Sequence, residues 1–320
     1  MQELNLAGSA DALVRAHTSL GDFDLTVCSD GTYLLDGGAM FGVVPKTMWS
    51  RRIAADDQNR IRLGLNTVIV RTGRHTVAIE TGIGNKQPPK MRQIFENQEL
   101  LPQSLAAAGV RPDEIDFVIN THLHFDHCGW NTTLQTDGRV TPTFPNARYF
   151  AHRGELEHGH LQLERDRVSY ISENYDPLVE SRQMTLLESA DFAAASEGRV
   201  PICPGISVEM FPGHTAQMMA VHIEPPRAAE SRPAGFASPG GAISRSPHAC
   251  YIADLLPTAH HLDVTWVMGY DLDPLRCIEE RKRFYARAIP EDWLVLFTHD
   301  HDTPMARLAL NDKGKPIVRG

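Results

Sequence analysis

The sequence has no excess of positive charge, and this excludes one broad class of partner. Its 320 residues include 31 lysines and arginines against 40 aspartates and glutamates, which gives a formal net charge of −9 at pH 7. Nucleic-acid backbones are bound mainly through clustered basic side chains. We therefore expect no nucleic-acid partner.

Long apolar runs are also missing. A membrane-spanning helix needs about 20 consecutive apolar residues, whereas one of the longest runs here is Trp293–Phe297. Residues 1–17 contain no basic segment followed by an apolar one, which is the pattern of a secretory signal. We expect a chain without membrane contact that is located in the cytoplasm.

Cysteine is scarce and scattered. The cysteines are odd in number and none belongs to a C-x-x-C pair; the five are Cys28, Cys128, Cys203, Cys250 and Cys277. This pattern favours neither a disulfide framework nor a cysteine-rich structural zinc site, and it suits a reducing cytosol. Histidine, by contrast, occurs 15 times, and this abundance favours a metal-binding site.

The overall composition is that of a folded globular chain. Apolar residues make up 42% and charged residues 22%, close to ordinary soluble domains. No internal repeat is visible, and we predict one domain over residues 1–320. Residues 225–247 are rich in proline, glycine, serine and alanine, which predicts an exposed loop.

Predicted strands and helices alternate along the chain, which indicates an α/β fold. Strands are predicted at 24–36 (with a turn at Asp30-Gly31), 65–71, 75–80, 116–120, 201–211, 219–223, 248–253 and 294–297. Helices are predicted at 100–108 and 273–288, and residues 153–190 have helical spacing. Histidines and aspartates recur where strands end, and functional sites on α/β scaffolds collect there.

The densest group of potential ligands is the segment THLHFDHCGWN, residues 121–131. It holds His122, His124, Asp126 and His127 directly after a predicted strand. His122 and His124 leave the same face of an extended chain, whereas Asp126 and His127, beyond the turn, can point at a second position. One zinc ion takes about three or four ligands, so this group is better suited to begin two metal sites than to complete one.

This motif resembles the signature of the metallo-β-lactamase-fold hydrolase superfamily, and the resemblance covers residues 25 to 310 approximately. It implies a four-layer αββα sandwich. The variant HLHFDHCGWN is most similar to the branch of lactonases and phosphotriesterase-like hydrolases. In that branch the motif contributes ligands to two metal ions, which we expect to be zinc, with iron, cobalt or manganese as alternatives.

The resemblance also implies where the remaining ligands lie. Matched motif by motif, the implied set is His122, His124 and His214 for the first ion, Asp126, His127 and His299 for the second, and Asp254 bridging both. Asp254 lies in YIAD and His299 in LFTHD, each at the end of a predicted strand. Asp263 is a rival for Asp254, and His301 is a rival for His299.

Two positions depart from the family pattern. The aspartate that braces the metal loop in the family is replaced by Glu80, in the segment ETG. Quorum-quenching lactonases carry a tyrosine shortly after the bridging aspartate, but here Asp254 is followed by LLPTAHH. The missing tyrosine argues against specificity for acyl-homoserine lactones and leaves the implied metal ligands intact.

The implied chemistry is hydrolysis. Two divalent ions about 3.5–4 Å apart can share one water and lower its pKa from near 16 towards 7. The resulting bridging hydroxide would attack the substrate, and Asp126 is the predicted catalytic residue that carries the proton to the leaving group. We predict a dinuclear-metal-dependent hydrolase of a small lactone, carboxylic ester or phosphotriester.

Other activities of the fold agree less well with the sequence. The β-lactamases are secreted, and nucleases bind polyanions. Thioesterases of the glyoxalase II type add a helical region after the last ligand, whereas only 21 residues follow His299. The flavin-linked di-iron enzymes have an acid where His124 stands. The alternative from another class is a non-catalytic metal-binding or interaction protein, and a homodimer stays open.

The apolar segment GGAMFGVVPKTMW, residues 37–49, supplies the predicted substrate-binding residues Met40, Phe41 and Trp49. One interpretation is an apolar wall over the substrate, and the other is a tight turn in the core. Cys128 is predicted to pack rather than to bind metal. His261 is predicted to be solvated or to face the substrate.

Overall fold

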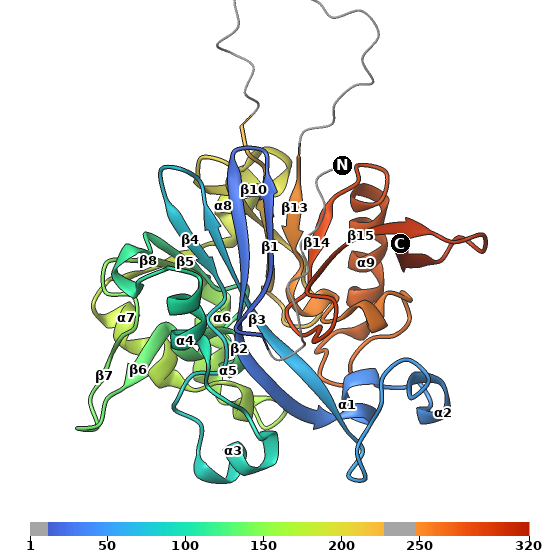
Figure 1. Ribbon diagram of the computed structural model, residues 1–320, viewed down its shortest axis with the longest axis horizontal. Helices are drawn as coiled ribbons and strands as arrows, with labels where there is room; N and C mark the ends of the chain where they lie inside the picture. Colours follow the sequence, from blue (N-terminus) through green and yellow to red (C-terminus); the bar gives the residue numbers. More distant parts are fainter. Residues whose placement is uncertain (1–11, 227–246, 320) are drawn as a thin grey trace, which may run out of the picture.

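A computed structural model of the chain describes residues 12–226 and 247–319 (Figure 1). Two seven-stranded sheets pack face to face, and helices cover their outer faces. This arrangement is the predicted αββα sandwich, so the fold prediction is confirmed. Most of the loop predicted at 225–247 lies outside the described residues. In the part that is described, no helix is long and apolar enough to span a membrane.

The first sheet has the strand order β1-β2-β3-β4-β5-β8-β9. These strands are β1 (Val14–Leu20), β2 (Phe23–Asp36), β3 (Arg60–Arg71), β4 (Thr76–Ile79), β5 (Phe117–Ile119), β8 (Arg148–His152) and β9 (Met184–Leu187). Strands β1 to β4 pair in antiparallel fashion, and β4, β5, β8 and β9 pair in parallel. A separate small hairpin consists of β6 (Thr132–Leu134) and β7 (Val140–Pro142).

The second sheet follows chain order from β10 to β16. Its strands are β10 (Arg199–Cys203), β11 (Ile206–Met210), β12 (Met219–Ile223), β13 (Ala249–Tyr251), β14 (Leu294–Leu296), β15 (Met305–Leu310) and β16 (Pro316–Val318). Only the β13–β14 pair is parallel. Each sheet therefore has neighbouring strands whose carboxyl ends meet at one edge.

The α-helices are mostly short. They are α1 (Gly37–Phe41), α2 (Lys46–Trp49), α3 (Pro89–Phe95), α4 (Leu101–Ala107), α5 (Phe125–Cys128), α6 (Arg153–Leu161), α7 (Asp176–Glu180), α8 (Ser189–Ala194) and α9 (Pro274–Ala288). The long helix α9 begins as its sequence predicts, because Asp273 accepts a hydrogen bond from the Arg276 N–H and Pro274 occupies the first helical position.

Apolar side chains fill the space between the sheets and beneath the helices. Val68 on the first sheet and Val221 on the second belong to one buried cluster, which also includes Phe284 of α9. Leu105 of α4 packs on the outer face of the first sheet. Burial of one such side chain contributes about 1.5–3 kcal/mol, so the sheet edges that carry the candidate site rest on a rigid core.

Three element predictions needed correction. The single strand predicted at 201–211 is a hairpin, because Gly205 with a φ of 83° turns the chain between β10 and β11. Residues 153–190, predicted as helical, also contain strand β9, which is too short for its periodicity to be recognised. Strand β2 runs on through Asp30-Gly31, and the expected turn there is a β-bulge between Ser29 and Thr32.

Candidate metal centre

The seven predicted ligands come together at one edge of the sandwich, where strands of both sheets end. His122 follows β5, His214 follows β11 and His299 follows β14. Asp254 lies on a short 3₁₀ turn, η6 (Ala253–Leu255), just after β13. The strand ends thus carry the ligands, as expected for sites on layered α/β scaffolds.

Glu80, which follows β4, anchors the loop that carries the motif. One oxygen of Glu80 accepts the backbone N–H of Thr121 at 2.9 Å, and the other lies 3.7 Å from His127 Nδ1. Glu80 adopts a φ of 62°, a conformation that non-glycine residues rarely adopt without compensating contacts. The longer acid therefore braces the motif directly. Gly129 completes the support, since a Cβ there would lie 2.0 Å from the carbonyl carbon of Ile83.

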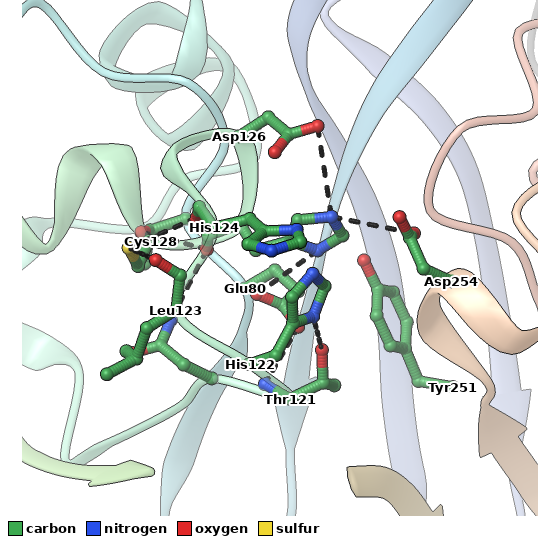
Figure 2. A network of polar contacts seen from close by, with 12 residues as sticks. Glu80, Thr121, His122, Leu123, His124, Asp126, Cys128, Tyr251 and Asp254 are labelled. Carbon is green, nitrogen blue, oxygen red and sulfur yellow. Dashed lines mark hydrogen bonds and ion pairs between the residues drawn. The ribbon is translucent and has the colours of Figure 1, made fainter. Parts of the chain in front are cut away.

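His122, His124 and His214 form the first group of candidate ligands. One nitrogen from each lies within 4.8 Å of the others, and all three side chains are buried. His214 Nε2 is 3.1 Å from His124 Nδ1. The Nε2 atom of His122 is buried and has no hydrogen-bond partner among the described residues. Figure 2 shows His122 and His124 side by side within this network.

Asp126, His127 and His299 form the second group, again with ligand atoms within 4.8 Å of one another. The Nε2 atoms of His127 and His299 are 3.3 Å apart, and Asp126 Oδ2 is 3.6 Å from His299 Nε2. In Figure 2 the carboxylates of Asp126 and Asp254 approach the histidines from different sides.

Asp254 lies between the two groups. Its Oδ2 is 3.4 Å from His214 Nε2, while its Oδ1 is 3.2 Å from His299 Nε2 and 3.5 Å from His127 Nε2. Each carboxylate oxygen thus faces a different group. The rival Asp263 points elsewhere and pairs with Lys315 at 2.7 Å.

The other rival is also placed outside both groups. His301 Nδ1 lies 3.4 Å from Arg15, and no group of potential ligands within the described residues includes it. The strand-end argument that favoured His299 over His301 therefore agrees with the geometry.

The outer contacts of the histidines orient unprotonated nitrogens inward. His214 Nδ1 lies 3.0 Å from Asp271 Oδ1, and His299 Nδ1 lies 3.0 Å from the Gly64 carbonyl oxygen. Since both outer atoms are acceptors, each Nδ1 must carry the proton, and each Nε2 presents a lone pair to the centre. Lone pairs that face one another at these distances repel unless a cation or a proton lies between them. The donor set therefore fits divalent metal ions.

Burial lowers the pKa values of two histidine ligands, whereas at His127 and His214 the carboxylates, Asp254 first, outweigh burial and raise the pKa. Burial, together with the neighbouring histidines, holds the pKa values of His122 and His124 well below 6.5, so both imidazoles are neutral at pH 7. Burial would raise the pKa of Asp254, but His299, His127 and His214 outweigh it and hold that pKa well below its usual range. Neutral imidazoles and ionised carboxylates are the species that coordinate metals.

A cavity of about 270 Å³ opens onto both groups. Its polar lining includes Asp126, Asp254, Tyr33 and Arg165, and its apolar lining consists of Leu35, Met40, Met91, Phe95, Phe125, Val168, Met268 and Leu272. The floor of the cavity is thus the candidate metal centre, and its walls are mainly apolar.

The predicted apolar wall is corrected in part, because only Met40 of its three residues lines the cavity. Phe41 and Trp49 are fully buried and stack on each other with centroids 5.3 Å apart. His261 is also buried, not solvated, and stacks on Phe41 at 4.5 Å. Gly37 leaves the room for this stack, since a Cβ there would lie 2.4 Å from the Trp49 ring.

Cys128 packs as expected. Its side chain is fully buried, and its thiol donates to the His124 carbonyl oxygen at 3.2 Å. The sequence did not predict two other residues that contact the centre. These are Asp271, which contacts His214, and Tyr33, which contacts Asp126. Both are far from the motif in the sequence, so no local pattern marks them.

The chain was then compared with known proteins. The model of the metallo-beta-lactamase superfamily matches residues 61–227, more than half of the chain. Among solved structures, a probable metal-dependent hydrolase from Staphylococcus aureus is 26% identical with a TM-score of 0.78, and the match covers 94% of this chain and 99% of that chain.

Two further structures share the fold at lower identity. The hydrolase AbOPH of the beta-lactamase superfamily is 17% identical, with a TM-score of 0.71 and coverage of 94% and 95% of the two chains. AidC, a dizinc quorum-quenching lactonase in complex with the product N-hexanoyl-L-homoserine, is 17% identical, with a TM-score of 0.71 and coverage of 98% and 99%. Because the family model matches more than half of the chain, including the motif at residues 121–131 and His214, the chain belongs to the metallo-beta-lactamase superfamily.

Proposed function

We propose that the protein is a dinuclear-metal-dependent hydrolase that cleaves an ester-type bond in a lactone, a carboxylic ester or a phosphotriester. The family places the chain among metal-dependent hydrolases. The observation that carries the dinuclear part is the position of Asp254, whose two oxygens face two different groups of candidate ligands. AidC, which has the same fold, is a dizinc lactonase, and this supports a lactone as one candidate substrate.

Each ion would have its own set of side chains. His122, His124 and His214 would hold the first, Asp126, His127 and His299 the second, and Asp254 both. Nitrogen and carboxylate ligands without cysteine suit zinc in an open, catalytic site, and iron, cobalt and manganese remain alternatives. When bound, the ions would lower the pKa of a shared water and polarise the substrate oxygen.

The protein itself supplies a proton carrier and a dry pocket. Asp126 lines the cavity and its side chain is 12% exposed, so it can accept the proton of the attacking water and pass it to the leaving oxygen. Water adds across the ester bond, which yields an acid and an alcohol. The apolar walls, to which Met40 and Phe95 contribute, favour substrates with bulky apolar groups next to that bond.

The remaining properties follow from the same features. The single core that joins both sheets supports one domain over residues 1–320. A cavity of this size suits a small molecule. All five cysteines are free thiols, which supports a cytoplasmic location. A homodimer is compatible with these features.

The proposed function is tested by metal analysis and a substrate panel on one preparation. We expect about two divalent ions per chain, as the two-metal chemistry requires, and turnover that disappears on chelation and returns with added metal. An aryl ester, an aryl phosphotriester and a long-chain lactone should each have a higher kcat/KM than unsubstituted butyrolactone. A clear preference for butyrolactone would refute the role of the apolar walls.

The same experiment separates the enzyme from the alternative of a non-catalytic metal protein. Metal at the expected stoichiometry without turnover of any ester, phosphotriester or lactone of the panel would favour that alternative. Protein without metal, even after supplementation, would refute both.

A further inference from the structure

We propose that Tyr33 is a positioning residue that holds the Asp126 carboxylate in place for the second metal ion and for proton transfer. The Tyr33 hydroxyl donates to Asp126 Oδ2 at 2.8 Å. Its oxygen also lies 3.3 Å from His299 Nδ1 and 3.5 Å from His299 Nε2. The phenol therefore touches two members of the second ligand group. This role deepens the proposed function and rests on it for the part that Asp126 plays.

A β-bulge in strand β2 positions this phenol. Tyr33 lies on β2 just after the bulge between Ser29 and Thr32. A bulge re-aims the side chains that follow it, and bulges are frequent next to active sites. Beyond the bulge, Tyr33 and Leu35 share one face of the strand, and both line the cavity.

The ring is held rigidly, so the hydroxyl has little freedom. Tyr33 is 1% exposed, its edge contacts Phe95 at a centroid distance of 6.2 Å, and its face is tilted against His299 at 5.5 Å. A rigid ring of this kind delivers its hydroxyl to one point. A flexible donor such as lysine would lose more conformational entropy in the same role.

The Asp126 carboxylate depends on this one hydroxyl for its hydrogen bonding. Among the described residues, Tyr33 is the only hydrogen-bond donor to the Asp126 carboxylate. The histidine ligands have outer contacts of their own, such as that of His214 with Asp271 and that of His299 with Gly64. Asp126 is also partly open to the cavity, where an unrestrained carboxylate would sample several rotamers. Outer hydrogen bonds of this kind tune metal affinity and ligand orientation.

No tyrosine closely follows Asp254 in the sequence, so the phenols near the centre come from other segments. The only phenols that line the cavity in the described part of the chain are Tyr33, from β2, and Tyr270. Tyr33 contacts the ligands, whereas Tyr270 is 37% exposed and has no hydrogen bond to them. The two residues therefore provide a matched pair for experiment, with Tyr270 as the control.

The primary test is metal affinity, measured by chelator competition on purified Tyr33→Phe and Tyr270→Phe proteins without any substrate. Tyr33→Phe keeps the ring and removes only the hydroxyl. We expect one of its two zinc ions to bind about 10- to 100-fold more weakly, the usual cost of losing an outer partner, while the other ion is unaffected. Tyr270→Phe should bind both ions like the wild type. Equal affinity of Tyr33→Phe and wild type for both ions would overturn the role.

A double-mutant cycle separates positioning from general support. If Tyr33 acts through Asp126, Tyr33→Phe should cost metal affinity in the wild type and almost nothing in the Asp126→Asn background. Equal costs in both backgrounds would show that Tyr33 acts by another route. Because these measurements need no turnover, they stand even if the substrate panel fails, and the two failures are distinguishable.

A second measurement covers the case in which Tyr33→Phe does not fold. Fluorotyrosine can be incorporated into the Tyr270→Phe protein, and zinc can be titrated while ¹⁹F NMR spectra are recorded. Tyr170, whose ring meets that of His124 of the first group edge to face at a centroid distance of 4.9 Å, provides an internal reference for that group. Tyr251 also lies beside the centre, so its resonance is assigned with a Tyr251→Phe protein, and a further tyrosine resonance should move with the filling of the other site. If none does, Tyr33 does not contact that site and the role is refuted.

Discussion

Two buried regions of this molecule combine histidines with carboxylates, yet only one has the properties of a metal site. The first is the candidate metal centre. The second, called here the Glu209 cluster, lies on the second sheet and consists of Glu209, His222, His248 and Glu224, with the arginines Arg199, Arg283 and Arg287. Each region has buried histidines beside a buried carboxylate, so that combination alone does not distinguish them.

The difference lies in how the polar atoms are paired. In the Glu209 cluster, His222 Nε2 is 2.8 Å from Glu209 Oε2, and His222 Nδ1 is 2.9 Å from His248 Nε2. Glu209 also accepts from Arg287 at 2.8 Å. In this chain of contacts, donors alternate with acceptors. In the metal centre, the outer acceptors of His214 and His299 hold the Nδ1 protons, so the Nε2 atoms of these two histidines face the other ligands as acceptors.

The two regions also differ in their balance of charge. Arginines permanently neutralise Glu209, whereas no lysine or arginine among the described residues forms an ion pair with Asp126, Asp254 or Glu80. The metal centre therefore has negative charge that no fixed protein cation balances. Buried histidine alone is thus a poor sign of function, and unpaired inward lone pairs beside uncompensated carboxylates are a better one.

The largest expected effect that separates the two regions is on catalysis. Asp126→Asn keeps the size of the side chain but removes the proton carrier and an anionic ligand, so kcat on a good substrate should fall about 100- to 10,000-fold. The matched variant in the Glu209 cluster, His248→Gln, should retain kcat when folded protein is compared. Wild-type kcat in Asp126→Asn would remove Asp126 from the mechanism.

The sequence was sufficient for the features that are local or that recur in the family. The HxHxDH motif has six residues with fixed spacing, and the later ligands lie directly after apolar strands, so both were recognisable. The αββα layers followed from the same resemblance and are confirmed. Helix α9 was marked by its own capping residues, Asp273 and Pro274.

The residues that were missed depend on long-range packing. Tyr33 reaches Asp126 across 93 positions of sequence, and Asp271 reaches His214 across 57. Phe41 gave a strong apolar signal, but a buried aromatic and a pocket-lining one have the same local pattern. Only the depth of the α1 segment in the fold, which sequence periodicity does not encode, distinguishes them.

The next largest effect concerns stability and its dependence on pH. Burial would raise the pKa of Glu209, but His222 and Arg287 outweigh it and hold that pKa well below the ordinary 4.5. The ionised form therefore stabilises the fold above about pH 4.5, and this contribution is lost as the pH falls below that value. Glu209→Gln leaves the partly buried arginines Arg199, Arg283 and Arg287 without their partner, and the cost should stay below the value of about 3–5 kcal/mol for a fully buried pair.

Urea unfolding from pH 3 to pH 8 measures this effect. The stability difference between wild type and Glu209→Gln should be full at neutral pH and should shrink below about pH 4.5, because the unfolded chain then takes up a proton at Glu209 that the folded chain does not. Metal content at neutral pH should be unchanged in the folded fraction. A difference that is constant across this pH range would contradict the depressed pKa of Glu209.

The smallest effects are expected when a carboxylate that contacts the outer nitrogen of a histidine is replaced. Each region has one such carboxylate, so the two variants compare the regions directly. Asp271 is fully buried and lies 3.0 Å from His214 Nδ1, whereas Glu224 is 39% exposed and lies 3.4 Å from His248 Nδ1. Asp271→Asn should weaken metal binding about 10- to 100-fold, because it no longer fixes the His214 proton on the outer nitrogen. The amide keeps the volume and the hydrogen bond to the Met268 N–H.

Glu224→Gln removes the corresponding charge from the Glu209 cluster. Glu224 itself is 39% exposed, so solvent screens its contacts with His248 and Arg199, and ion pairs with an exposed member contribute about 0–1 kcal/mol. We therefore expect a change of less than about 1 kcal/mol in unfolding free energy and no change in metal affinity. Chelator competition and urea unfolding on both variants test the contrast. If Glu224→Gln weakened metal binding as much as Asp271→Asn, the two regions would be coupled, and the Glu209 cluster could not be regarded as purely structural.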